Sequence, residues 1–309
     1  MQKVRVGVVG VGYLGSLHAE KFSAMENVDL VGVVDIDPTK RDLVAYKCKT
    51  KAYENYKDIV NEVDAVSIAV PTTIHYEVGR FFIEHGKDVF MEKPLASTVE
   101  EGKKLVELSK EKGVILQVGH LERFNGAFTK ALPHIKNPLF LESERIGPFR
   151  ERGLDVDVIL DLMIHDIDLI SYIVKSEVRE IKAVGVPVLT DRIDIAQAWI
   201  EFKNGAVANV TASRVSRENV RKLRVFQTDG YLSIDFLGKK ATYIKRGTLD
   251  YEIFSGYETD PLMEELKSFV DCVIKKGKPP VSGEDGLRVL IIAELIKNEI
   301  GRRLERHEI

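Results

Sequence analysis

Hydrophobic positions in the first half of the chain alternate between short continuous runs and helical spacings. Nearly unbroken apolar runs predict buried strands at 4–9, 30–34, 65–70, 88–91 and 114–118. The segments between them, at 13–25, 38–46, 74–85 and 98–112, have the spacing of helices. Strands that alternate with helices of this length form βαβ units. The first half therefore predicts a parallel sheet with helices on both faces.

The second half has another rhythm, in which strands follow one another with few helices between them. We expect helices at 125–135, 156–174, 261–276 and 283–303, and strands at 140–146, 195–202, 207–213, 223–228, 231–236, 241–245 and 251–254. Asn204-Gly205 and Asp229-Gly230 mark two tight hairpin turns. This pattern predicts an α+β domain with a large, mostly antiparallel open sheet. We place the two domains at 1–121 and 122–309.

Composition narrows the class of protein. The 309 residues are 44% hydrophobic and 30% charged, with a formal net charge of −3, which is typical of a globular chain and argues against a general nucleic-acid binder. The apolar N-terminus is too short for a membrane span and lacks the layout of a signal peptide, so we expect a cytoplasmic protein. Cys48 and Cys272 have no metal-binding spacing, and no metal site is predicted.

A glycine motif follows the first predicted strand and opens the first helix. The motif is Gly10-Val11-Gly12-Tyr13-Leu14-Gly15. Gly10 permits the tight turn, and Gly15 allows close packing of helix on strand. Gly12 leaves space for a pyrophosphate, which the free N–H groups of the first helical turn would bind. In this position the motif predicts a dinucleotide site to which Tyr13 and Leu14 also belong.

Asp35 indicates which dinucleotide binds. It ends the second strand, twenty residues after Gly15, where a carboxylate can accept hydrogen bonds from ribose hydroxyls. A carboxylate there repels a 2′-phosphate, so we expect NAD rather than NADP. The alternative, a turn or capping role before Pro38, fits Asp37 better.

Two further motifs carry candidate chemistry. Glu92-Lys93-Pro94 comes directly after a strand, at the sheet edge where ligands bind, although spacing alone would favour an ordinary surface lysine. Asp161 and His165 lie four residues apart on one predicted helix and so share a face, with Asp168 a further turn along. A carboxylate beside an imidazole raises its basicity. The apolar neighbours of His165 leave a purely structural role open.

Together these features resemble the Gfo/Idh/MocA family of sugar and inositol dehydrogenases. The resemblance rests on the glycine motif, Asp35, Val70-Pro71, Glu92-Lys93-Pro94, the segment from Asp161 to Asp168, and helix starts at Asp260-Pro261 and Ser282-Gly283, and so covers nearly the whole chain. It implies an oxidoreductase that transfers a hydride between NAD and a secondary alcohol of a sugar. It also implies cofactor contacts from Pro71, Thr72, Glu92 and Lys93.

The resemblance implies catalytic roles as well. The cofactor takes the hydride of the alcohol, so the protein must take the proton. His165 with Asp161 suits that task, and the positive charge of Lys93 would stabilise a developing alkoxide. Whether Lys93 or His165 is the formal base stays open.

Two segments, 118–125 and 145–150, are most similar to members that act on nucleotide sugars, the bacterial UDP-N-acetylglucosamine 3-dehydrogenases. Arginines suit phosphate oxygens, and we expect Arg123, Arg145 and Arg150, with Arg152 nearby, to meet a diphosphate beside Lys93, Asp161 and His165. Ordinary surface roles for these arginines are the alternative.

Other functions remain open at this point. They are a polyol, inositol or free-sugar dehydrogenase, an NAD-dependent glycosidase that recycles its cofactor, and a non-catalytic NAD-sensing regulator. In long strands with apolar alternation, such as the one with Ala196, Ala198 and Ile200, local helices can cover one sheet face, but the other needs a partner or water. We therefore expect a homodimer or homotetramer, with no nucleic-acid or membrane partner.

Overall fold

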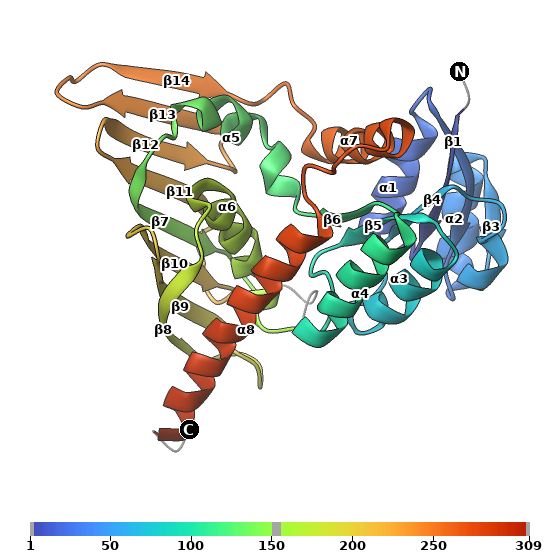
Figure 1. Ribbon diagram of the computed structural model, residues 1–309, viewed down its shortest axis with the longest axis horizontal. Helices are drawn as coiled ribbons and strands as arrows, with labels where there is room; N and C mark the ends of the chain where they lie inside the picture. Colours follow the sequence, from blue (N-terminus) through green and yellow to red (C-terminus); the bar gives the residue numbers. More distant parts are fainter. Residues whose placement is uncertain (1–2, 150–155, 307–309) are drawn as a thin grey trace. The chain divides into compact units, whose positions relative to one another are not determined.

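The computed structural model describes residues 3–149 and 156–306. The chain divides into two compact units (Figure 1). Unit 1 contains residues 1–120 and 262–290, and unit 2 contains residues 121–261 and 291–309.

Unit 1 is built on a six-stranded parallel sheet with the order β3-β2-β1-β4-β5-β6, as the alternation of strands and helices predicts. Its order reverses direction between β1 and β4, which is where an open α/β sheet binds its ligand. The strands are β1 (Val4–Val9), β2 (Val28–Val34), β3 (Lys51–Tyr53), β4 (Ala65–Ile68), β5 (Asp88–Glu92) and β6 (Leu116–Gly119). The helices are α1 (Tyr13–Ser23), α2 (Pro38–Cys48), α3 (His75–Glu84), α4 (Val99–Lys112) and α7 (Pro261–Lys275), with short 3₁₀ turns at η1 (Tyr56–Ile59) and η2 (Thr72–Ile74).

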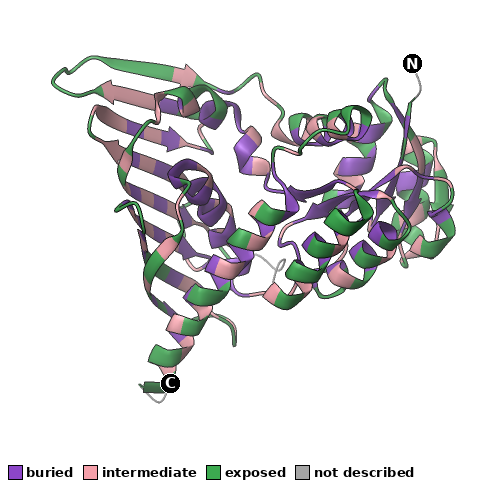
Figure 2. Cartoon of the chain, viewed as in Figure 1, coloured by how far each residue is buried: buried purple, intermediate pink, exposed green. Residues whose placement is uncertain are grey.

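Helices cover both faces of this sheet. Phe90 points to the face of α1 and α7, where its ring lies 5.7 Å from that of Phe269. The next residue, Met91, points the other way, close to Gly79 on α3, which packs against α4. Every residue of β4, β5 and β6 is buried, because apolar helix faces lie on both sides (Figure 2).

The segment 262–290 differs from the expected division at residue 121. We expected it in the second domain, but it belongs to unit 1. Leu266, Phe269 and Val270 of α7 are fully buried in the core that also contains Val6 and Phe22. Burial of these large side chains stabilises the fold, so packing rather than position in the sequence decides to which unit the segment belongs. The long helix α8 (Gly283–Arg306) contributes to both units, since the division falls after Leu290.

Unit 2 is built on an eight-stranded sheet with the order β14-β13-β12-β11-β7-β10-β9-β8. Neighbouring strands are antiparallel except for β7 and β10, which are parallel. The strands are β7 (Pro138–Ile146), β8 (Val178–Val186), β9 (Ile195–Phe202), β10 (Val207–Ser213), β11 (Val220–Gln227), β12 (Gly230–Asp235), β13 (Lys240–Lys245) and β14 (Tyr251–Ser255). The helical elements are α5 (Gly126–Ala131), α6 (Ile164–Val174), a π-helical turn η5 (Ile159–Met163), and 3₁₀ turns η3 (Leu121–Phe124) and η4 (Leu132–His134).

The two predicted hairpins are present, between β9 and β10 and between β11 and β12. The edge strand β8 was not predicted, because charged residues interrupt its apolar alternation. The helix expected at 125–135 is shorter, since Pro133 lies in the 3₁₀ turn η4 that follows α5. No helix in the described ranges is long and apolar enough to cross a membrane.

Candidate active site

The glycine turn of unit 1 has the geometry that its sequence predicts. Gly10 has a φ of 83°, in the region that favours glycine, and a side chain there would meet the carbonyl of Ala69 at 2.7 Å. A Cβ on Gly15 would lie 1.8 Å from the carbonyl oxygen of Gly10, so α1 could not pack this closely on the turn. A Cβ on Gly12 would meet no protein atom within 4 Å. Packing therefore explains Gly10 and Gly15, whereas Gly12 borders open space, which fits an approaching pyrophosphate.

Asp35 lies at the end of β2 and binds the same turn. Its Oδ2 accepts a hydrogen bond from the backbone N–H of Val11 at 2.8 Å, and its Oδ1 accepts one from Asp37 at 2.9 Å. A carboxylate has about four acceptor sites, so each oxygen keeps a lone pair for a ribose hydroxyl. Asp37 caps α2 by accepting hydrogen bonds from the N–H groups of Thr39 and Lys40. The capping role before Pro38 therefore belongs to Asp37, as expected.

Large apolar side chains are exposed around this turn. Tyr13 is 70% exposed and Leu14 40%, while Ile36, which the sequence analysis did not single out, is 87% exposed. Ile36 could have been noticed as an isoleucine directly after the acidic residue. After β4, the neighbour of β1 in the sheet, Pro71 precedes the turn η2 and Thr72 begins it; the backbone carbonyl of Thr72 accepts a hydrogen bond from Ser97.

Glu92 and Lys93 stand at the end of β5. Glu92 is only 9% exposed, and Lys93 is half-buried. One oxygen of Glu92 lies 3.1 Å from Nε2 of His18, and the other accepts the backbone N–H of Lys93 at 3.2 Å. Although burial opposes ionisation, the nearby imidazole of His18 holds the pKa of Glu92 below its ordinary value. The carboxylate that we expected to touch the cofactor thus has partners inside unit 1.

Asp161 and His165 of unit 2 lie on one helical segment, as predicted, but Asp161 belongs to the π-helical turn η5 rather than to an α-helix. Such turns occur frequently at functional sites. Both side chains are half-buried, whereas Asp166 and Asp168 beyond them are 1% exposed. The segment therefore presents Asp161 and His165 where solvent reaches and turns the next two carboxylates inward. Asp168, which we expected one turn farther along, is a buried structural residue.

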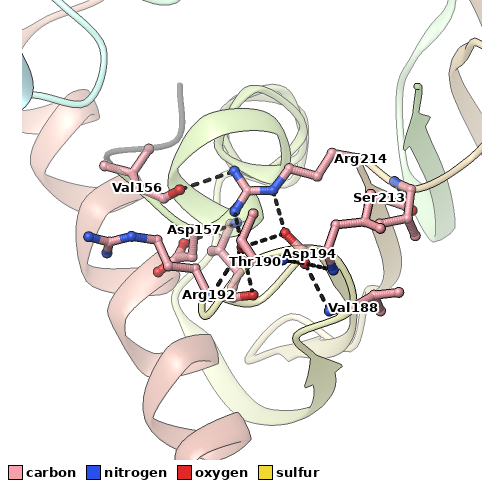
Figure 3. Close-up of polar contacts among 11 residues, drawn as sticks. Val156, Asp157, Val188, Thr190, Arg192, Asp194, Ser213 and Arg214 are labelled. Atoms are coloured by element: carbon pink, nitrogen blue, oxygen red, sulfur yellow. Dashed lines mark hydrogen bonds and ion pairs between the residues drawn. The ribbon is translucent and has the colours of Figure 1, made fainter. Parts of the chain in front are cut away.

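The start of this segment is fixed by a polar network (Figure 3). Asp157 caps it by accepting hydrogen bonds from the N–H groups of Ile159 and Leu160 at 3.1 and 3.0 Å. The carbonyl of Val156 accepts one from Arg214, whose Nε binds the fully buried Asp194 at 2.8 Å. These contacts hold the turn that carries Asp161.

Two of the arginines that we expected to bind a diphosphate contact other groups. Arg123 forms a bidentate pair with Asp168, at 2.8 and 2.6 Å. Arg145 binds Asp166 at 2.8 Å through Nε and Glu122 at 2.8 Å through Nη1. Both arginines are less than 10% exposed. A buried guanidinium needs such carboxylates, and both side chains have them within unit 2, which does not favour the expected diphosphate contact of Arg123 and Arg145. Arg150 and Arg152 lie outside the described residues.

The described residues hold no cluster of histidine, cysteine, aspartate or glutamate that could bind a metal ion. Besides Ile36, the residues of unit 1 that the sequence did not point to are His18 and Ser67. Both side chains are fully buried; His18 contacts Glu92, and Ser67 contacts His18. The sequence gives one clue to His18, which is its position on the buried side of the predicted helix 13–25. That position does not identify the partners of the imidazole.

Comparisons with known proteins agree with this geometry. Residues 4–120 match the family model "Oxidoreductase family, NAD-binding Rossmann fold", and residues 117–233 match the Gfo/Idh/MocA C-terminal domain. UDP-N-acetylglucosamine 3-dehydrogenase of Acidithiobacillus ferrooxidans is 35% identical, over 99% of this chain and 100% of that protein. Its solved structure superposes with a TM-score of 0.92 and 36% identity, covering 97% of this chain and 98% of the other. Myo-inositol 2-dehydrogenase of Thermotoga maritima is 29% identical over 96% of each chain.

The glycine turn, the position of Asp35 and the full-length similarity support one conclusion. The expected NAD cofactor and dehydrogenase class are confirmed, and the chain belongs to the Gfo/Idh/MocA oxidoreductases, which bind NAD on a Rossmann fold.

Proposed function

We propose that this dehydrogenase oxidises the C3 hydroxyl of a UDP-N-acetylhexosamine. The observation that carries the proposal is the UDP-N-acetylglucosamine 3-dehydrogenase that matches the chain from end to end at 35% identity. The myo-inositol 2-dehydrogenase is less similar, at 29% identity over 96% of this chain. It makes an inositol the second candidate substrate.

The cofactor residues follow from unit 1. Gly10, Gly12 and Gly15 form the pyrophosphate turn together with the exposed Tyr13 and Leu14. The remaining lone pairs of Asp35 accept the ribose hydroxyls, and Ile36 offers an apolar surface to the adenine. Pro71, Thr72 and Lys93, at the ends of the two following strands, would serve the nicotinamide half. Glu92 contributes indirectly, because His18 and the N–H of Lys93 already bind its carboxylate.

The catalytic residues in this proposal are Lys93, Asp161 and His165. Bound NAD supplies the hydride acceptor. Oxidation of the alcohol also releases a proton, which His165 accepts at its imidazole. Asp161 then stabilises the imidazolium, and the ammonium of Lys93 stabilises negative charge on the substrate oxygen. Since Arg123 and Arg145 have buried carboxylate partners, we keep only Arg150 as a proposed diphosphate ligand.

The proposal is tested with UDP-N-acetylglucosamine, NAD, glutamate and an aminotransferase that accepts 3-keto sugars. The coupling is needed because formation of the 3-keto sugar by NAD is unfavourable, so removal of the ketone draws the reaction forward. We expect the mass of the sugar nucleotide to change to that of the 3-amino product. Parallel reactions contain myo-inositol, scyllo-inositol or glucose in its place.

Lys93→Ala and His165→Ala serve as controls in the same assay. Each is expected to lose on the order of 10²- to 10⁴-fold in turnover while NADH binding stays nearly unchanged. Efficient turnover of an inositol or free hexose, with none on any UDP-sugar, would rule out the nucleotide-sugar substrate. Near wild-type rates in both variants would instead show that the catalytic residues are misassigned.

We also propose that the chain self-associates through the open face of the unit 2 sheet. Every second residue of these strands points to the sheet face that the helices cover, and Leu141, Val225 and Leu232 on that face are fully buried. Their neighbours on the opposite face form a row that crosses six strands in register. The rings of Phe140 and Phe226 stack at 5.4 Å within it. We call this row the open-face row; its members are Val207, Phe140, Phe226, Tyr231, Ile244 and Tyr251.

A further inference from the structure

A line of buried polar side chains connects three elements of unit 1. Oγ of Ser67, on β4, lies 2.8 Å from Nδ1 of His18, on α1. Nε2 of the same imidazole lies 3.1 Å from Oε1 of Glu92, at the end of β5. Ser67 and His18 are both 0% exposed. Oε2 of Glu92 accepts the backbone N–H of Lys93 at 3.2 Å, so the line ends at the lysine of the Glu-Lys-Pro motif.

The carboxylate of Glu92 fixes the direction of one contact in this line. An ionised carboxylate only accepts, so the proton in the 3.1 Å contact between Nε2 of His18 and Oε1 of Glu92 comes from His18. On the other side of the ring, the hydroxyl of Ser67 can either donate to Nδ1 or accept from it. The contact with Glu92 therefore requires a proton on Nε2 of His18.

The surrounding packing leaves Glu92 little freedom. A Cβ on Gly119 of β6 would lie 3.1 Å from the carboxyl carbon and from both oxygens of Glu92, so glycine there makes room for the carboxylate. On the other side, the imidazole of His18 stands edge-on to Phe90, with ring centroids 5.5 Å apart. Glu92 is thus held between a donor on α1 and the backbone of β6.

We propose that His18 is a positioning residue for Lys93. It fixes the carboxylate of Glu92, which in turn fixes the backbone of Lys93 and stands beside that residue as a negative charge. The helix that carries His18 begins at the glycine turn, so the same helix serves the cofactor phosphates and the catalytic lysine. This inference rests on the proposed role of Lys93 in turnover.

A purely structural role for His18 predicts something different. If the residue only filled space against Phe90, an apolar side chain of similar size would replace it well. If it acts through its Nε2 proton, only a side chain that can donate to Glu92 would restore function. His18→Leu and His18→Gln separate these cases, because the glutamine amide can place an N–H where Nε2 lies. His85→Leu, an exposed histidine of the same unit, is the matched control.

The first readout does not need substrate. Lys93 is labelled with an amine reagent in the full-length protein, and its rate is measured by peptide mass spectrometry against the other lysines. We expect the Lys93 rate to change in His18→Leu, to change likewise in Glu92→Gln, and to stay at the wild-type value in His18→Gln and His85→Leu. Unchanged labelling of Lys93 in both His18→Leu and Glu92→Gln would overturn the proposal, and Glu92→Gln still decides it if His18→Leu does not fold.

The second readout is turnover of the substrate found above. His18→Leu is expected to lower kcat by up to about 100-fold, with a much smaller change in the Kd of ADP-ribose, and His18→Gln should recover most of the loss. The double variant of His18→Leu and Glu92→Gln should be no worse than Glu92→Gln alone, because both act through one carboxylate. Equal kcat for the leucine and glutamine variants would contradict positioning. Absence of turnover in the wild type would refute the proposed function, and the labelling would still decide the role of His18.

Discussion

At the scale of single residues, the structure separates functional positions from those that packing explains. Gly10 and Gly15 are required by the turn itself, since any side chain there would overlap backbone atoms. Gly12 and the exposed Ile36 have no such explanation within the protein. Asp35 belongs to both groups, because it braces the glycine turn and keeps acceptor sites for hydroxyls.

Asp35 gives a prediction about cofactor choice. The protein should bind NAD more tightly than NADP, because a carboxylate accepts from the 2′-hydroxyl and repels a 2′-phosphate. Asp35→Ser should narrow the difference in Kd measured by calorimetry, while Asp37→Ser, which alters the cap of α2 and its ion pair with Lys40, should leave it unchanged. Equal affinities for the two cofactors in the wild type would contradict the assignment of Asp35.

At the scale of elements, the helix that carries Asp161 and His165 depends on loops distant in sequence. Asp194 accepts three backbone N–H groups, from Val188, Leu189 and Thr190, at 2.6 to 2.8 Å. It also binds Arg214, which holds the carbonyl of Val156 just before the helix (Figure 3). Although burial opposes ionisation, these donors hold the pKa of Asp194 far below its ordinary value.

The lowered pKa predicts how stability depends on pH. A carboxyl group whose folded pKa lies below its unfolded pKa, about 3.9, stabilises the fold above that value and loses the contribution as the pH falls. Asp194→Asn should lower the free energy of unfolding by about 3 kcal/mol at pH 7, because it removes a buried carboxylate partner of Arg214. At pH 3.5 the difference in the free energy of unfolding between the two proteins should be smaller, by up to about 1 kcal/mol.

Urea unfolding of both proteins at the two pH values measures this effect. Asp191→Asn, an exposed neighbour, is the control and should change stability by less than about 0.5 kcal/mol. A deficit for Asp194→Asn that stays constant or grows on acidification would show that the carboxylate is not selectively stabilised in the folded state.

At the scale of the whole molecule, the open-face row predicts association between copies. Trp199 beside it is 44% exposed, and Tyr251 at its end is 63% exposed. Arg224, on the same face as Phe226, forms ion pairs with Glu142 and Glu144. An apolar row flanked by charges that are already paired is suited to burial against a second copy.

Light scattering at micromolar concentration should therefore give the mass of a dimer or tetramer. Phe226→Glu should shift the distribution toward monomer, since it places a charge in the row. Tyr46→Glu, which changes an exposed aromatic residue of α2, should not. A monomeric wild type would contradict the interface.

The sequence by itself determined the features that depend on neighbouring residues. Alternation of apolar runs and helical spacing predicted the parallel sheet, the two hairpin dipeptides predicted their turns, and the glycine motif predicted the NAD site. These signals are local, because backbone conformation and the period of burial depend on residues a few positions apart.

Only the tertiary structure decided which distant residues meet. It placed α7 in the core of unit 1, paired Arg123 with Asp168 across 45 positions, and brought His18 to Ser67 across 49. A buried arginine and a surface arginine look alike in sequence, and so do a core histidine and a positioning one. Their roles depend on burial and on the partner that neutralises or orients them, and both arise only when the chain has packed.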